Sequence, residues 1–249
     1  MRIIKEAIIP LDSEERVNVL TINDTVFERN RSKKVELLAK AYDHAKHAYK
    51  FGFRMLTLGW SDGSTFLPVN SILLSSENKK NRINEACIVD KRTVGYRRRQ
   101  LSIEKGTTAM LELLKAAKTA AIPAKYVLFD SWFSSPSTLH AVKGIGYDVI
   151  GMVKKTPKMF FRYNSEDMSL ISTDTSLSED EIIRIYGKRW DTEVFFKVCK
   201  SYLNLSKECN SLSYDAITAH TAVVFTRYMM LSLESRESND SRSLGEIFL

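Results

Sequence analysis

Cysteines, histidines and long apolar runs are scarce in this chain of 249 residues. The three cysteines, Cys87, Cys199 and Cys209, are an odd number, have no C-x-x-C spacing and follow no secretory leader. These features exclude a disulfide framework and predict reduced intracellular thiols. The four histidines are scattered along the chain, so no His or Cys spacing favours a zinc site.

No stretch reaches the roughly 18 consecutive apolar residues that a membrane span requires. The first residues carry charges at positions 2, 5 and 6, which interrupt any apolar signal-peptide core. We therefore expect a cytoplasmic protein that makes no contact with a membrane. The hydrophobic fraction of 44% and aromatic fraction of 10% are those of a folded globular chain, and one domain is the default expectation at this length.

The formal net charge is +7, and the basic residues cluster in three runs, at 29–34, 91–99 and 152–162. Two of these runs contain aromatic residues, a combination that suits phosphate contact with base stacking. Each run alone is equally well explained as a solvated loop. Together the three runs favour a nucleic-acid partner.

Hydrophobic periodicity predicts an α/β fold. Three early strands are separated once by a helix, and strands then alternate with helices, which implies parallel pairing. Ser178 and Glu181 form a capping box that opens one long helix through residues 186–200. The predicted strands are 17–24, 53–60, 66–74, 126–129 and 147–153, and the other predicted helices are 32–50, 106–121, 135–146 and 214–236.

Three acidic residues are candidates for chemistry. Asp24 closes the first strand, Asp130 closes the strand after the long helix, and Glu193 lies on the late helix. If the first and fourth strands are neighbours, as in a ribonuclease-H-like sheet, the two aspartates project side by side and a packed helix brings Glu193 to them. Each aspartate alone is also explained as an ordinary turn former or helix cap.

A cluster of three carboxylates in a pocket repels itself unless divalent cations bridge it. Mg²⁺ prefers oxygen ligands, and two ions about 3.5–4 Å apart clamp the attacking and leaving oxygens of a phosphoryl displacement. Asp24, Asp130 and Glu193 are therefore candidate ligands for two Mg²⁺ ions, with Mn²⁺ as a substitute.

The late helix carries a row of polar residues. At about 100° per residue, Tyr186, Arg189, Glu193 and Lys200 fall on one stripe of a continuous helix. An i, i+4 pair explains Arg189 and Glu193 alone, whereas a helix lying along DNA uses all four. Trp190 is a candidate for stacking on an extruded base, although a core position is the more frequent role for tryptophan.

The Y-x2-R-x3-E-x6-K pattern of these four residues resembles the signature of the DDE transposases of the insertion-sequence-four family of bacteria. The segment "YVLFDSWFSSP" resembles the family's second conserved region, and "VLTINDTVFERNRSKKVELL" with "LTLGWSDGSTFLPV" resembles the first. The similarity covers nearly the whole chain. It implies a ribonuclease-H-like mixed sheet of about five strands flanked by helices, forming a single catalytic domain over 1–249.

The resemblance implies that Asp24, Asp130 and Glu193 bind two Mg²⁺ ions, and that Tyr186, Arg189, Lys200 and Trp190 bind DNA. It further implies cleavage at the terminal inverted repeats, sometimes through a hairpin, then strand transfer into target DNA by a homodimer in the synaptic complex. Asp62 in "WSDGS" is the rival for the first carboxylate and is ranked as a turn residue.

The family usually has a DNA-binding region before the first aspartate and a β-rich insertion before the glutamate. Here 23 residues precede Asp24, and Glu193 follows Asp130 by 63 positions, so 154–177 is interpreted as a shortened insertion. A catalytically silent remnant that binds DNA or a full-length transposase is therefore an alternative to an active transposase. A ribonuclease-H-type nuclease is a further alternative.

Overall fold

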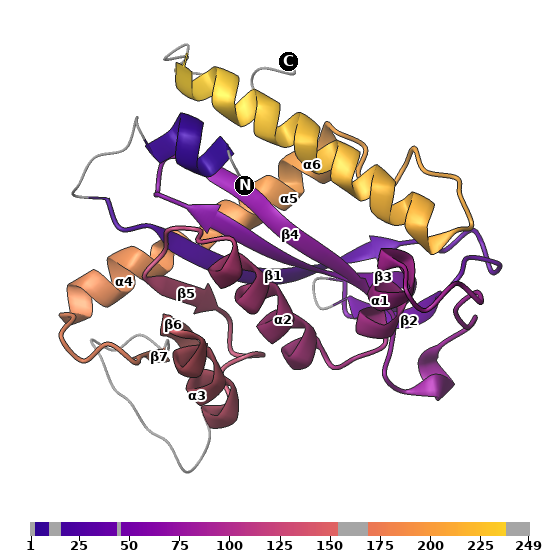
Figure 1. The fold of residues 1–249 in the computed structure, drawn as a ribbon, viewed down its shortest axis with the longest axis horizontal. Helices are drawn as coiled ribbons and strands as arrows, with labels where there is room; N and C mark the ends of the chain where they lie inside the picture. Colours follow the sequence, from indigo (N-terminus) through magenta and orange to yellow (C-terminus); the bar gives the residue numbers. More distant parts are fainter. Residues whose placement is uncertain (1–2, 10–15, 44–45, 154–168, 238–249) are drawn as a thin grey trace. The chain divides into compact units, whose positions relative to one another are not determined.

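The computed structural model describes residues 3–9, 16–43, 46–153 and 169–237 (Figure 1). The strands are β1 (Val19–Glu28), β2 (Ala39–Asp43), β3 (Ala48–Ser61), β4 (Phe66–Leu74), β5 (Tyr126–Phe129), β6 (Asp148–Val153) and β7 (Ser169–Ser172). The helices are α1 (Val94–Ser102), α2 (Gly106–Thr119), α3 (Pro136–Ile145), α4 (Glu179–Gly187), α5 (Trp190–Ser201) and α6 (Tyr214–Glu237), with short turns at Ile4–Ile8 and Lys79–Asn81. None of the helices in these ranges is long and apolar enough to cross a membrane.

The seven strands form one mixed sheet in the order β2-β3-β1-β5-β6-β7, with β4 also paired to β3. β1 and β5 are parallel, with Thr21 opposite Leu128, and β5 and β6 are parallel, whereas β2–β3 and β6–β7 are antiparallel. The predicted adjacency of the first strand and the strand 126–129 is thus confirmed. A mixed sheet with flanking helices agrees with the predicted ribonuclease-H-like fold, and β2 and β7 are the two strands beyond the predicted five.

The chain divides into two compact units, each of which consists of three separate segments of the sequence. The first unit consists of Met1–Asn23, Leu58–Val69 and Leu111–Glu193, and the second of Asp24–Thr57, Asn70–Met110 and Val194–Leu249. The single catalytic domain over 1–249 stays a prediction. Of the predicted short insertion 154–177, residues 154–168 lie outside the described residues, as does most of the basic run 152–162.

In the first unit, all four residues of β5 are buried, and Val149, Ile150 and Gly151 are buried in β6. α3 packs against β6 and α4 against β6 and β7, so the short apolar runs 126–129 and 148–153 are covered by helices (Figure 1). The core cluster consists of Val19, Tyr126, Leu128, Ile150, Ile185 and Tyr186. Burial of these apolar side chains between strand and helix stabilises the unit.

The ends of α3 follow the predicted signals. Ser135 caps its first turn by accepting a hydrogen bond from the Thr138 amide, and Pro136 occupies a first-turn position where no amide donor is needed. Gly146 ends the helix in the left-handed region at φ 92°, where a side chain is disfavoured. α3 thus forms the connection between the parallel strands β5 and β6.

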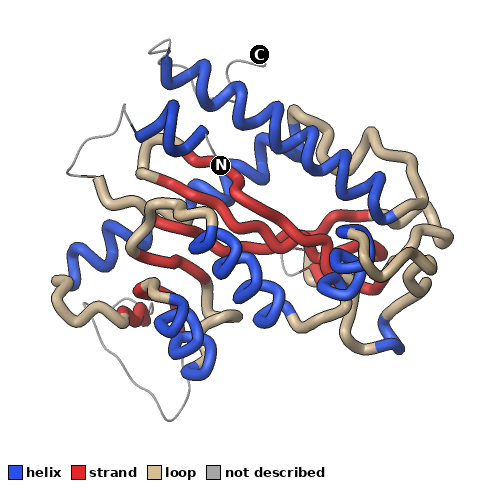
Figure 2. The backbone as a smooth tube through the Cα atoms, in the orientation of Figure 1, coloured by secondary structure: helices blue, strands red, loops and turns tan. Residues whose placement is uncertain are grey.

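The helix predicted over 32–50 is wrong. Ala39–Asp43 forms β2, which pairs antiparallel with Ala48–Gly52 of β3 (Figure 2). Burial alternates strictly along β2, with Ala39, Ala41 and Asp43 inside. Alanine and lysine favour a helix intrinsically, but pairing with an existing strand and a period of two override that preference.

The single helix predicted through 186–200 is also wrong. α4 begins at the predicted capping box, in which Ser178 and Glu181 satisfy each other's backbone amides, and it ends at Gly187. The amides of Lys188 and Arg189 donate to carbonyls three residues back instead of four, at 3.2 and 2.9 Å, and α5 then begins at Trp190. Glycine is a poor helix former, and the tightened turn there places Tyr186 and Glu193 on different helices.

In the second unit, α5 and α6 pack through aromatic rings, with Phe195 4.9 Å from Phe225 and 4.8 Å from Tyr228 between centroids. The basic run 91–99, expected to be a loop, forms α1, which Thr93 caps by accepting a hydrogen bond from the Tyr96 amide. Positive charge in that run concealed a helix because the arginines fall on both its exposed and its buried sides.

Candidate active site

The predicted site residues are divided between the two units. Asp130, Tyr186, Arg189, Trp190 and Glu193 belong to the first unit. Asp24 and Lys200 belong to the second. The structure therefore gives the neighbours of each group within its own unit.

Asp130 follows the last residue of β5 and turns the chain. Its Oδ1 accepts a hydrogen bond from the Trp132 amide at 2.9 Å, and its carbonyl accepts one from the Ser134 hydroxyl at 3.0 Å. The turn-forming role expected of an aspartate at a strand end is thus present. The same turn fixes the side chain at the carboxyl end of a parallel strand, where ligands of α/β sheets gather.

Tyr186 connects the polar residues of the first unit. Its ring is 7% exposed and belongs to the core cluster, and its hydroxyl lies 3.4 Å from the Phe129 carbonyl. Burial raises the pKa of Tyr186; nearby Arg189 lowers it, and the charges of Asp130 and Glu193 raise it further. The charges of Asp130, Arg189 and Glu193 thus all act on this phenol, but the buried ring does not offer the stacking surface expected for Tyr186.

Arg189 and Glu193 form the i, i+4 ion pair that was the simpler interpretation of these residues. Nη2 of Arg189 lies 2.8 Å from Oε1 of Glu193, and their side chains are 16% and 38% exposed. The guanidinium also lies 5.8 Å from the centroid of the Tyr186 ring. The Glu193 carboxylate is therefore partly accessible and already paired with a cation.

Two buried polar contacts fix the first turn of α5. The hydroxyls of Thr192 and Thr21 of β1 lie 2.8 Å apart, and both residues are fully buried. Asp191 accepts a hydrogen bond from the Ser61 hydroxyl at 2.6 Å. Burial raises the pKa of Asp191, and no pattern in the sequence distinguishes this carboxylate from its neighbour Glu193. These contacts hold the segment that presents Glu193.

Lys188 anchors the linker between α4 and α5. Its ammonium donates to the carbonyl of Val17 at 2.6 Å and to that of Asp62 at 3.0 Å. Gly63 has a φ of 94°, and a Cβ there would lie 3.1 Å from the Lys188 side chain. The positive φ therefore favours glycine at this turn, and a side chain there would crowd the end of Lys188.

Asp62, the rival for the first carboxylate, is a turn residue, as predicted from the sequence. It is 2% exposed, and its Oδ1 accepts hydrogen bonds from the amides of Ser64 and Thr65 at 2.8 and 2.7 Å. Arg16 pairs with its other oxygen at 3.3 Å. The carboxylate is committed to the connection between β3 and β4.

The more frequent core role is wrong for Trp190, which is 62% exposed, and Trp132 beyond Asp130 is 50% exposed. Two apolar side chains of these helices, Ile183 and Val194, are also exposed, at 46% and 43%. The break at Gly187 changes the rotation of α5 relative to α4, so a wheel drawn through both helices misassigns their faces. Trp190 is a large apolar side chain open to solvent.

In the second unit, Asp24 lies within β1 and is paired with Arg54 of β3. Nε of Arg54 donates to Oδ2 of Asp24 at 2.6 Å, and the side chains are 26% and 18% exposed. β1 continues to Glu28, so Asp24 does not end the strand as predicted. Arg54 was not recognisable from sequence because it stands alone in an apolar strand.

Lys200 occupies the last turn of α5 and donates to the Thr25 hydroxyl at 2.5 Å. Burial lowers the pKa of Lys200, while the carboxylates of Asp43 and Glu28 raise it and Lys46 lowers it further. Thr25 directly follows Asp24 in the sequence, and it is a partner that the sequence pattern did not indicate.

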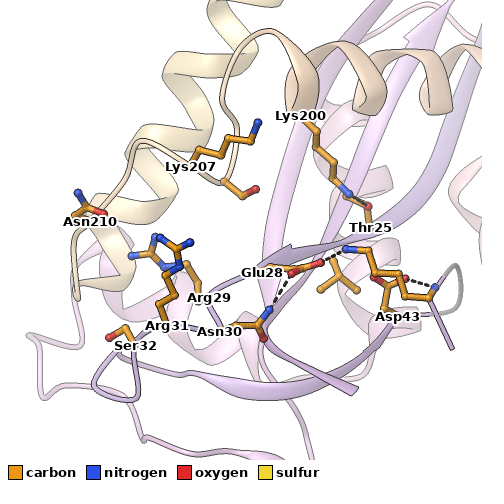
Figure 3. A pocket seen from close by; sticks show the side chains of 13 residues that line it. Thr25, Glu28, Arg29, Asn30, Arg31, Ser32, Asp43, Lys200, Lys207 and Asn210 are labelled. Carbon is orange, nitrogen blue, oxygen red and sulfur yellow. Dashed lines mark hydrogen bonds and ion pairs between the residues drawn. The ribbon is translucent and has the colours of Figure 1, made fainter. Parts of the chain in front are cut away.

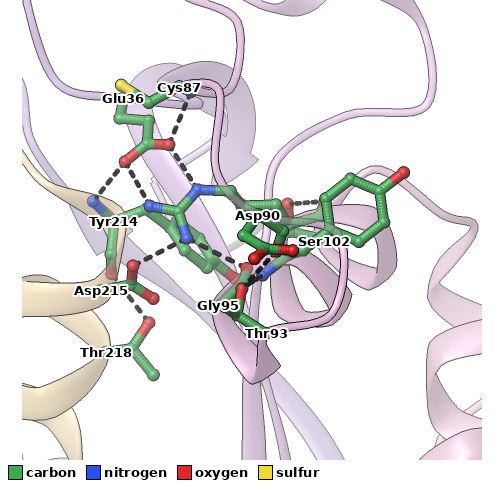
Figure 4. A network of polar contacts seen from close by, with 11 residues as sticks. Glu36, Cys87, Asp90, Thr93, Gly95, Ser102, Tyr214, Asp215 and Thr218 are labelled. Carbon is green, nitrogen blue, oxygen red and sulfur yellow. Dashed lines mark hydrogen bonds and ion pairs between the residues drawn. The ribbon is translucent and has the colours of Figure 1, made fainter.

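The basic run 91–99 contributes to a buried ion-pair network rather than to a free cationic surface at Arg99. Arg99 is 3% exposed and donates to both oxygens of Glu36 at 2.6 and 3.0 Å, and to Asp215 at 2.7 Å (Figure 4). Glu36 also accepts from the amides of Cys87 and Tyr214. This network stabilises the second unit.

Asp24, Asp130 and Glu193 are the predicted metal ligands. Carboxylate oxygens are the donors that Mg²⁺ prefers, so Asp24, Asp130 and Glu193 suit it chemically. Among residues 3–9, 16–43, 46–153 and 169–237, however, no group of three or more His, Cys, Asp or Glu is arranged to hold a metal ion. Arginines pair with two of the three carboxylates, so the described arrangement is not one that coordinates a metal directly.

Comparisons with known proteins bear on the family. The fold is similar to that of piggyBac transposase in a cryo-EM structure of its synaptic complex with hairpin DNA, at a TM-score of 0.46 and 13% identity. The alignment covers 92% of this chain and 55% of that one, so this chain spans about half of the transposase chain. No curated protein gives a match. The family model of DDE superfamily endonucleases matches residues 1–169, about two thirds of the chain, including Asp24 and Asp130; the chain therefore belongs to the DDE superfamily endonucleases.

Proposed function

We propose that this protein is a DNA transposase that cleaves DNA at the terminal inverted repeats of an insertion sequence and joins the ends to target DNA. Membership of the DDE superfamily endonucleases supports phosphodiester chemistry on a nucleic acid. Transposition by cut-and-paste, the insertion-sequence-four family and assembly as a homodimer are parts of this proposal. All rest on the chain's resemblance to those transposases.

The observation that carries the proposal is the parallel pairing of β1 and β5. Thr21 lies opposite Leu128, and the two aspartates follow these residues by three and two positions. Both aspartates fall inside the matched family region. Carboxyl ends of parallel neighbours share one sheet edge, where a pair of carboxylates can act on one phosphate.

We assign Glu193 as the third carboxylate. It lies outside the matched region. Its support is its ion pair with Arg189 and the effect of the Asp130 and Glu193 charges on the pKa of Tyr186 in the same unit. The buried contact between Thr21 and Thr192 holds the adjacent turn to β1. A carboxylate fixed in this way is preorganised for a single function.

Asp24, Asp130 and Glu193 would hold two Mg²⁺ ions, which supply electrostatic stabilisation for phosphoryl transfer when bound. Arg54 and Arg189 must release their carboxylates, or reorient, for these residues to become ligands. Arg189 and Lys200 are proposed to contact DNA phosphates, and exposed Trp190 to stack on an unpaired base. Tyr186 is proposed to contact a DNA phosphate through its hydroxyl, because its ring is buried and does not offer a stacking surface.

The test is cleavage of labelled duplex DNA that carries the inverted repeats flanking the gene, with Mg²⁺ or Mn²⁺. Glu193→Gln is expected to abolish cleavage while leaving DNA binding in place, because it removes a charge without removing volume. Glu112→Gln is the matched control, since Glu112 is an exposed carboxylate on α2 that pairs with the exposed Lys115. Its activity is expected to equal that of the wild type.

Two other outcomes favour the alternatives. DNA binding without cleavage by the wild type supports a silent remnant that binds DNA or a full-length transposase. Degradation of an RNA–DNA hybrid in preference to terminal-repeat DNA supports a ribonuclease-H-type nuclease. Equal cleavage by wild type and Glu193→Gln would refute the role assigned to Glu193.

A further inference from the structure

A pocket of about 930 Å³ opens in the second unit, outside the residues assigned to catalysis (Figure 3). Its walls come from the end of β1 and the loop that follows it, from Asp43 and Lys46 around the β2–β3 connection, and from Lys200 with the loop 206–210. Segments far apart in the sequence therefore converge on one cavity. All of its lining residues belong to the second unit.

The pocket is cationic. Five lysine or arginine side chains line it against two carboxylates, which gives a net charge of +3. Most of the other lining residues are Ser, Thr or Asn, and Val26 is the single apolar residue. Pockets for drug-like small molecules are predominantly apolar, so this lining suits a hydrated polyanion better.

Both carboxylates accept hydrogen bonds, and Glu28 is paired with a lysine. Glu28 accepts hydrogen bonds from the Lys46 ammonium at 2.5 Å and from the Asn30 amide at 2.8 Å. Asp43 accepts one from the Lys46 amide at 3.2 Å. These contacts lie on one side of the pocket in Figure 3, and the side chains of Arg29, Arg31 and Lys207 lie on the other. Three of the five cations of the pocket therefore share one wall.

The cations of that wall differ in role. The Arg29 guanidinium donates to the carbonyls of Cys209 and Ser211, at 2.8 Å for the latter, and so braces the loop 206–210. Arg31 and Lys207 are exposed, and their side chains make no hydrogen bond or ion pair within the described ranges. Their charge is available to a ligand, and the brace fixes the loop that presents Lys207.

Lys200 lines the same pocket beside Thr25 (Figure 3). Its ammonium donates to the neutral Thr25 hydroxyl and pairs with no carboxylate at hydrogen-bonding distance in the described residues. Two of its three N–H donors are therefore left for a ligand. Its side chain is only partly exposed, so an anion bound there would be more strongly attracted than at the surface.

We propose that this pocket binds the sugar-phosphate backbone of DNA, with Arg31 and Lys207 contacting phosphates at its rim and Lys200 a phosphate inside it. The proposal rests on the proposed function, because it takes the bound DNA to be the substrate of the transposase. It adds a binding surface that the row of residues 186–200 did not include. Four of the five cations of the pocket lie outside that row.

The test is binding without chemistry. Arg31→Gln and Lys207→Gln, singly and together, are titrated in EDTA with fluorescent terminal-repeat duplex DNA from 50 to 200 mM salt. Each lost phosphate contact is expected to reduce the slope of log affinity against log salt by about 0.9. The double variant is therefore expected to lose a slope of about two and to bind clearly more weakly at 50 mM salt.

Lys34→Gln is the matched control. Lys34 is an exposed lysine in the same basic run, but it does not line the pocket. Its variant is expected to change the slope much less. Thermal unfolding midpoints of all variants are expected to match the wild type, because the replaced side chains are exposed.

The outcomes separate the two proposals. If the double variant and Lys34→Gln have the same slope of log affinity against log salt, the pocket does not bind DNA. Normal binding and cleavage by the wild type would leave the transposase proposal standing. Tighter wild-type binding to an RNA duplex of equal sequence would overturn DNA as the occupant. The wild type could also bind DNA without cleaving it. A smaller salt slope in the pocket variants would then support the pocket, and the absence of cleavage would refute the enzyme.

Discussion

Arg54 donates through its Nε to Oδ2 of Asp24 over 2.6 Å, so the first proposed metal ligand is held by a guanidinium from the neighbouring strand. Both side chains are partly buried, at 26% and 18% exposure. Burial strengthens such a pair relative to one at the surface. A cation that binds Asp24 must therefore compete with one that the protein itself supplies.

Arg54→Met is expected to tighten the binding of Mn²⁺ by about tenfold, which corresponds to about 1.4 kcal/mol. The substitution removes the competing charge and keeps much of the side-chain volume. Isothermal titration in the absence of DNA measures the affinity. Adding Asp24→Asn should abolish the gain, and an unchanged affinity in Arg54→Met would contradict Asp24 as a ligand.

Thr192→Val is expected to destabilise the protein by about 1–3 kcal/mol, because it leaves the buried Thr21 hydroxyl without its partner. Urea denaturation measures the change. The double variant Thr21→Val with Thr192→Val is expected to recover most of the loss, since no unpaired hydroxyl remains. Additive losses in the double variant would show that the hydroxyls do not interact.

Glu36→Gln is expected to cost about 1.5–3 kcal/mol at pH 7, because the buried Arg99 guanidinium loses the Glu36 carboxylate and keeps that of Asp215. Chemical denaturation measures it. Lys115→Gln is a suitable control, as it removes one partner of an exposed pair whose contribution is about 1 kcal/mol at most.

The same carboxylate gives a pH dependence. Burial raises the pKa of Glu36, but hydrogen bonds from Arg99 and from the Tyr214 and Cys87 amides outweigh it and lower the pKa below the ordinary 4.5. The stabilisation is thus complete above about pH 4.5 and is lost as the pH falls through the folded-state pKa. Unfolding midpoints of the wild type should fall more steeply below pH 4.5 than those of Glu36→Gln; parallel curves would contradict this assignment.

Trp190→Ala is expected to leave the free energy of unfolding within about 0.5 kcal/mol, since the side chain is 62% exposed. Binding of DNA with an unpaired base at the cleaved end should weaken by about 1–3 kcal/mol. Fluorescence anisotropy measures this. Met230→Ala, at 65% exposure on α6, is the control that should leave binding unchanged.

The sequence predicted best where local signals and tertiary packing agree. β5 occupies 126–129 as predicted, because a short apolar run between a helix and a turn-forming aspartate has few alternatives. α3 keeps its predicted serine cap, first-turn proline and terminal glycine. No local pattern predicted that β1 and β5 are neighbours; that expectation came from assuming a ribonuclease-H-like sheet.

Prediction failed where distant partners decide the structure. Ala39–Asp43 has helical composition but pairs with β3, and the turn after Gly187 separates two helices that share one apolar periodicity. The ion pairs of the proposed site were also unpredictable. Arg54 meets Asp24 across 30 positions of sequence, and only the strand register brings them together.

Lys188 holds the linker between α4 and α5 through the main-chain oxygens of Val17 and Asp62. Every amino acid has a carbonyl oxygen, so substitutions of the side chains at 17 and 62 leave both acceptors in place. Relatives are therefore expected to retain a long cationic side chain at 188 without correlated changes at the two partner positions. Covariation between aligned sequences would miss this contact, although it ties together three segments far apart in the chain.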